Sequence, residues 1–136
     1  MKKVHQKHAG KSSLELARLA GRAALDKKAE NLVILDVRGI SSFTDFFVLM
    51  TGRSTRHVQG LAEAVEDALR EKRLSPAATE GLRDGLWVLL DYNDVVVHIF
   101  YGETREFYNL EGLWHDAPRV PAEAVAGEGQ ASEGKP

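Results

Sequence analysis

The sequence predicts a single α/β domain in which a mixed sheet is flanked by helices, and three observations support this prediction. Two amphipathic segments, residues 12–28 and 54–73, have the spacing of helices, and short β-branched runs lie between and after them. Two of the later runs are joined by the polar residues 91–94, which is a hairpin signal. The chain has 136 residues, the length of one domain. We therefore expect the element order α-β-β-α-β-β-β-α.

The first part of the chain is expected to form one helix and two strands. Ser12 and Glu15 have the spacing of a capping box, in which the Ser12 hydroxyl accepts from the Glu15 amide, so the helix should begin at Ser12. Residues 31–37 are β-branched and apolar and indicate a buried strand. Residues 46–51 indicate a second strand, which Gly52 stops.

The second helix is predicted by its cap and by its apolar stripe. Ser54 or Thr55 can cap it, and its end is expected near Arg73, before Pro76. Apolar residues recur there at helical spacing: Val58, Leu61, Ala62, Val65 and Leu69.

The last part of the predicted domain contains the hairpin and a short helical turn. A brief extended piece at 77–80 precedes the two hairpin strands, 86–90 and 95–101. Residues 104–108 indicate a helical turn, and residues 109–116 indicate an irregular segment.

Charge is distributed unevenly along the chain. Residues 1–11 form a basic arm with four lysines, whereas the domain at 12–117 has a formal charge of −5. Residues 118–136 are rich in Pro, Gly, Ala, Glu and Ser, and we expect them to be a disordered tail. A mildly acidic domain is a poor match for broad nucleic-acid binding and favours a basic protein partner.

Composition excludes several classes of protein. The sequence has no cysteine, which excludes disulfides, thiolate zinc sites and cysteine nucleophiles. No apolar run approaches the ~20 residues of a membrane span. The N-terminal residues lack the apolar stretch of a secretory signal. We therefore expect a cytoplasmic protein that makes no membrane contact.

Candidate catalytic and metal motifs are weak. The histidines form no His-x-x-x-His pair on a predicted helix, and His5 and His8 lie in the basic arm, so we expect no metal and no cofactor. Residues 52–56 (GRSTR) would hold a phosphate at a helix N-terminus in one interpretation. In the other interpretation, which we favour, they are a strand-to-helix turn with an ordinary cap. Asp91 and Asp94 are likewise either a carboxylate pair or, more often at such positions, turn residues.

Aromatic and acidic residues concentrate in the C-terminal half and predict a binding surface. Trp and Tyr anchor interfaces because they bury a large area. His98 lies in mid-strand and is expected to be a structural histidine, hydrogen-bonded within the fold. The candidate surface combines the aromatic residues Trp87, Tyr108 and Trp114 with the acidic residues Glu80, Asp84, Asp91 and Asp94.

About 100 residues carry a resemblance to a known family. The text ILDVRGISSFTDFFVLMTGRSTRHVQGLAEAVEDAL, then EG, GLWVLLDYNDVVVHIF and REFYNLEGLW, resembles the ribosomal silencing factor family, also called the Iojap family. The basic arm and the tail lie outside this pattern.

The resemblance implies a fold and a function. It implies a fold similar to nucleotidyltransferases, and binding to the large ribosomal subunit through its protein fourteen, which prevents the small subunit from joining when nutrients are limiting. It implies no enzymatic activity. The residues expected at the contact surface are Trp87, Asp91, Asp94, His98, Glu80, Tyr108 and Trp114, with Trp87 as the apolar anchor. A homodimer through the same surface, a secondary contact with ribosomal RNA, and a nucleotide-binding or nucleotidyltransferase-type enzyme remain as alternatives.

Overall fold

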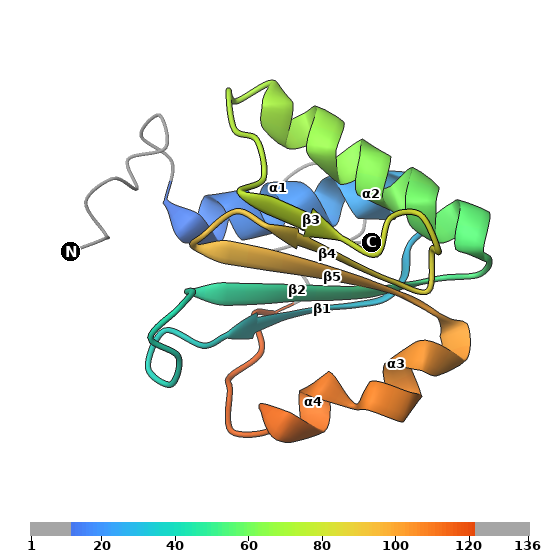
Figure 1. Cartoon of the computed structure of the whole chain (residues 1–136). Helices are drawn as coiled ribbons and strands as arrows, with labels where there is room; N and C mark the ends of the chain where they lie inside the picture. Colours follow the sequence, from blue (N-terminus) through green and yellow to red (C-terminus); the bar gives the residue numbers. More distant parts are fainter. Residues whose placement is uncertain (1–11, 122–136) are drawn as a thin grey trace, which may run out of the picture.

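Five strands form one mixed sheet, and helices lie on both of its faces (Figure 1). The computed structural model describes residues 12–121. The strands lie in the order β1-β2-β5-β4-β3 across the sheet. Only β2 and β5 are parallel, and the other neighbours are antiparallel. Their bounds are Glu30–Asp36 (β1), Phe46–Gly52 (β2), Ala78–Glu80 (β3), Trp87–Asp91 (β4) and Val95–Tyr101 (β5).

Helices α1 (Ser13–Asp26) and α2 (Thr55–Arg70) pack together on one face of the sheet (Figure 1). Ser12 caps α1 as predicted, because its hydroxyl accepts from the Glu15 amide at 3.1 Å. Helix α1 ends two residues earlier than expected, since Lys28 adopts a left-handed conformation with φ 66°. The predicted stripe of α2 is buried between α1 and the sheet: Val58, Leu61, Ala62, Val65 and Leu69.

Helices α3 (Gly102–Tyr108) and α4 (Leu110–Leu113) lie on the opposite face (Figure 1). They cover a second and smaller core that includes Leu35, Phe47, Leu49 and Phe100. The prediction of an irregular segment at 109–116 is wrong in part, because α4 occupies its centre. Asn109 ends α3 in a left-handed conformation with φ 46°, and its side-chain Oδ1 accepts from the Gly112 amide at 3.2 Å.

The predicted fold class and element order are confirmed, with α4 as an addition. β4 and β5 form the expected antiparallel hairpin, and the short extended piece is β3. Helix α2 ends at Arg70 rather than near Arg73. The prediction that 31–37 is a buried strand holds only in part, since β1 is an edge strand that is half exposed near its start.

Of the two predicted terminal segments, only the start of the tail lies within the described residues. Residues 1–11 and 122–136 lie outside them, so the basic arm and most of the tail stay predictions. The start of the tail contacts the sheet, because Arg119 pairs with Leu35 at the outer edge of β1. The Pro118 carbonyl accepts from the Asp36 amide at 2.8 Å, and the Val120 amide donates to the Ile34 carbonyl at 2.9 Å.

Candidate partner-binding site

One half of the sheet face that carries α3 and α4 is left uncovered. Residues paired across neighbouring strands point to the same side of a sheet, and the register pairs Glu80 with Leu89 and Leu89 with His98. Under β2 and most of β5 this side is buried, since α3 contacts both strands, but Val96 near the start of β5 is half exposed. Under β4 and β3 it is exposed or half exposed. We call this part the open face; it comprises the side chains of Glu80, Trp87, Leu89, Asp91 and Val96.

Trp87 lies at the boundary between the open face and the helices. Its ring stacks on Phe100, with centroids 5.2 Å apart, and contacts Tyr108 at 4.6 Å. Its Nε1 donates to Nδ1 of His98 at 3.1 Å, so the ring is held in one orientation while remaining half exposed. A large aromatic side chain that is already fixed loses little entropy on binding, which suits an interface anchor.

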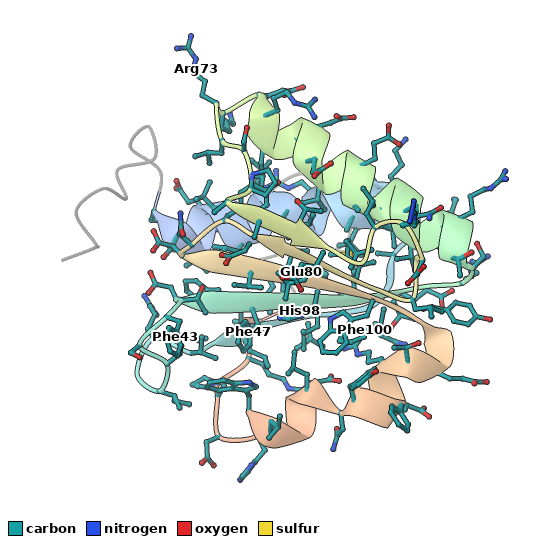
Figure 2. The ribbon with its side chains drawn as sticks, viewed as in Figure 1. Phe43, Phe47, Arg73, Glu80, His98 and Phe100 are labelled. Atoms are coloured by element: carbon teal, nitrogen blue, oxygen red, sulfur yellow. The ribbon has the colours of Figure 1, made fainter. Side chains whose placement is uncertain are left out.

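The His98 ring holds the Trp87 indole in place through this hydrogen bond. It is 5% exposed, and burial lowers the pKa of its imidazole to about 4. The ring is therefore neutral at pH 7, and because Nδ1 accepts from the indole, its proton is on Nε2. Phe47 and Phe100 lie beside it on the same side of the sheet (Figure 2). The expectation that His98 is a structural histidine, hydrogen-bonded within the fold, is confirmed, whereas its place among the partner-binding residues stays a prediction.

The acidic candidates are placed differently from one another. Glu80 is exposed on β3, and Asp91 is half exposed at the end of β4. Asp91 also serves the turn, since its Oδ1 accepts from the Asn93 amide at 2.8 Å. Asp94 does not reach the open face, because it is only 3% exposed. The backbone of Asp94 lies at the start of the parallel pair of β2 and β5, where the Asp94 carbonyl accepts from the Asp45 and Phe46 amides.

Tyr108 and Trp114 border the open face from α3 and the end of α4. Tyr108 packs against Trp87 with about half of its surface exposed. Trp114 contacts Phe47 edge to face, with centroids 5.1 Å apart, and is half exposed. Trp114 therefore helps to close the second core, whereas Tyr108 mainly adds to the exposed surface. Asp84 is exposed in the loop between β3 and β4.

Arg105 was missed by sequence reasoning although it holds α3 and α4 in place. It is 8% exposed, and its guanidinium forms a bidentate pair with Glu111 at 3.0 and 2.9 Å. Its Nη1 also donates to the Asn31 carbonyl at 2.7 Å and to Thr51 Oγ1 at 2.9 Å. The arginine beside Glu111 holds the pKa of that carboxyl below its usual value. In the sequence, Arg105 and Glu111 are two opposite charges six residues apart. Six residues is not the spacing of neighbours on one helix face, so the sequence alone did not indicate this ion pair.

The residues at 52–56 form a structural turn rather than an open phosphate cradle. The Ser54 hydroxyl caps α2 by accepting from the His57 amide at 3.0 Å. Arg53 pairs with Glu30 at 2.7 Å, and its amide donates to Nδ1 of His57. His57 Nε2 lies 2.8 Å from the Lys27 carbonyl and joins this turn to the end of α1. These groups are already used within the fold, which supports the interpretation that we favoured.

Within residues 12–121, no group of three or more His, Asp or Glu side chains has the arrangement of a metal site. In the same range, none of the helices is long and apolar enough to cross a membrane.

The chain is similar to known proteins over most of its length. A family model described as "Ribosomal silencing factor during starvation" matches residues 10–136. Ribosomal silencing factor RsfS of Halalkalibacterium halodurans is 44% identical over 114 residues, which cover 84% of this chain and 97% of that protein. RsfS of Bacillus subtilis is 41% identical over 103 residues, covering 76% and 87%. The crystal structure of a Chromobacterium violaceum protein superposes with a TM-score of 0.76 at 33% identity, covering 82% of this chain and 92% of that one.

Proposed function

Because the chain belongs to the ribosomal silencing factor (RsfS/Iojap) family, we propose that its open face binds protein fourteen of the large ribosomal subunit. Bound there, the domain would sterically prevent the small subunit from joining and so lower translation when nutrients are limiting. The site of action would be the cytoplasm. A silencing factor acts by binding and is not an enzyme, which argues against the nucleotidyltransferase alternative.

The observation that carries this proposal is the incomplete cover of one sheet face. On this side of the sheet, helices α3 and α4 bury the side chains of β2 and most of those of β5. They leave Trp87 and Leu89 on β4 and Val96 on β5 half exposed. Apolar residues that surround a fixed tryptophan form the kind of patch that a protein partner covers. Leu86, Phe107, Tyr108 and Leu113 add exposed apolar surface at its border.

Charge supports a basic partner. Glu80 and Asp91 lie on the open face itself, and the domain as a whole is mildly acidic. Complementary charge raises the rate of encounter and favours one orientation of docking. The same acidic groups repel phosphates, which makes ribosomal RNA at most a secondary contact.

Sedimentation with separated ribosomal subunits tests the proposal. The protein should migrate with the large subunit and not with the small one, and free protein fourteen should compete for it. Trp87→Ala should weaken binding by about 2 kcal/mol, or about 30-fold, as removal of an interface anchor does. Leu25→Ala removes an apolar side chain that is 40% exposed on the other side of the sheet and is the matched control.

Two results would count against the proposal. Binding that survives excess protein fourteen would place the contact elsewhere on the subunit. Full affinity in a folded Trp87→Ala protein would remove Trp87 from the interface. Sedimentation equilibrium of the protein alone then decides whether the open face instead joins two copies of this chain in a homodimer.

A further inference from the structure

A cavity of about 350 Å³ lies where β4 meets α3, next to Trp87. It extends the open face onto the helical layer, because the loop before β4 forms one wall and α3 forms the other. Its lining residues are Leu86, Trp87, Glu103, Thr104, Phe107 and Tyr108. A cavity of this size and place can receive one side chain of a bound partner.

Aromatic rings form most of the inner surface of this cavity. The ring centroids of Trp87 and Tyr108 are 4.6 Å apart, and the Phe107 ring packs edge to face on Tyr108 with centroids 5.0 Å apart. The Nε1 hydrogen of Trp87 is already donated to His98, so the indole offers an occupant the face of its ring and not a donor. Ring faces attract cations and pack well against flat groups.

Glu103 is the one charged residue in the lining. It is exposed in the first turn of α3. None of the salt bridges between side chains of residues 12–121 includes Glu103. The other acidic groups of this surface, Glu80 and Asp91, lie on the adjoining strands. An aromatic cavity with a single carboxylate at its rim is complementary to a cation on an apolar stem.

We propose that this cavity takes one arginine side chain of the ribosomal protein that the open face binds, an inference that rests on the proposed function. The planar guanidinium stacks against the aromatic rings and pairs with the Glu103 carboxylate, while its methylene stem packs against Leu86. Arginine fits better than lysine because it is planar, forms two parallel hydrogen bonds with a carboxylate, and is more weakly hydrated. An RNA segment fits poorly, since Glu103 would repel its phosphates.

Two glutamates of α3 provide a matched test. Glu103→Gln removes the charge in the cavity, whereas Glu106→Gln makes the same change on the side of α3 that borders Asn31 and Arg119. Affinity for purified large subunits is measured at two salt concentrations, with the melting temperature of each variant. Glu103→Gln should weaken binding about 5- to 10-fold at low salt and reduce its salt dependence. Glu106→Gln should bind like the wild type.

The outcomes separate this inference from the proposed function. If the wild type does not bind large subunits, both fail. If the wild type binds, Trp87→Ala weakens binding and Glu103→Gln does not, the cavity is not used and the open face stands. Equal weakening by both glutamate variants would mean that only net charge matters, which also overturns the inference.

A crosslink identifies the occupant. Phe107 is 81% exposed, so p-benzoylphenylalanine at this position should leave the fold intact. With purified large subunits, the inference requires a crosslink to a protein segment that contains an arginine. A crosslink to RNA, or to a protein segment without an arginine, would overturn it.

Discussion

Replacing Arg105 by Met tests whether its guanidinium holds the α3–α4 layer against the sheet. Methionine keeps the apolar stem but removes four hydrogen bonds, two to Glu111 and one each to Asn31 and Thr51. Removing one partner of a buried ion pair costs about 3–5 kcal/mol. The Glu111 side chain is 26% exposed and regains some hydration, so we expect the lower end, about 3 kcal/mol.

Urea unfolding followed by circular dichroism measures this loss. A loss of about 3 kcal/mol corresponds to a fall of roughly 15 °C in Tm for a domain of this size. The loss should depend on pH through Glu111. Its carboxyl has a lowered pKa in the folded protein, so the ion pair stabilises the fold fully above the usual glutamate pKa of 4.5. The difference in the free energy of unfolding between the wild type and Arg105→Met should therefore become smaller as the pH falls below 4.5.

A double-mutant cycle with Glu111→Gln isolates the pair. The two single changes should each destabilise the protein, and the double change should cost clearly less than their sum. A loss below about 1 kcal/mol for Arg105→Met would refute the reasoning, because it would mean that solvent replaces the guanidinium without a penalty. Large-subunit binding by Arg105→Met should fall as well, since Tyr108 would no longer be held against Trp87.

Three further predictions concern single residues. Burial lowers the pKa of His98 from 6.5 to about 4, so the buried neutral ring stabilises the fold fully above pH 6.5, and this stabilisation is lost as the pH falls toward 4. In urea unfolding, the free energy of unfolding of His98→Gln should therefore fall less between pH 7 and pH 5 than that of the wild type. Gly85→Ala should destabilise by about 1–3 kcal/mol, because φ is 69° and the new Cβ would lie 2.7 Å from the Thr55 carbonyl oxygen; Gly39→Ala, where nothing lies within 4 Å, should be nearly neutral in the same melting assay. Ser54→Ala should cost about 1 kcal/mol by thermal unfolding, since it removes the cap of α2, and Ser54→Asn should restore it.

Local signals in the sequence predicted most of the fold. The pairing of Ser12 with Glu15 and the apolar stripe of α2 act within a few residues, so they can be recognised without tertiary information. The hairpin at 91–94 is equally local. The exact end of α1 was less predictable, because a left-handed residue such as Lys28 stops a helix without a glycine or proline to mark the position.

The site depended on contacts that no local pattern contains. Trp87 and His98 meet only because the hairpin register brings them close on one side of the sheet. Arg105 reaches Asn31, 74 residues earlier in the chain. Asp94 was expected on the surface with Asp91, but it is only 3% exposed, beside the segment that leads into β2, whose Asp45 and Phe46 amides donate to its carbonyl. The residue types predicted an aromatic and acidic surface, whereas the strand register determines which of these side chains point to the same side of the sheet.

The extended segment at residues 118–120, which follows α4, affects the solubility of the chain. An unpaired sheet edge is a template for association with other chains, and the outer edge of β1 is occupied by residues 118–120. At the other edge, β3 has three residues, which is too short to recruit a long strand. A protein shortened to end at Ala117 would keep all the helices and strands described between residues 12 and 121, yet it would expose the Asp36 amide and the Ile34 carbonyl to pairing. Such a protein should aggregate during concentration, while one that ends at Pro121 should stay dispersed.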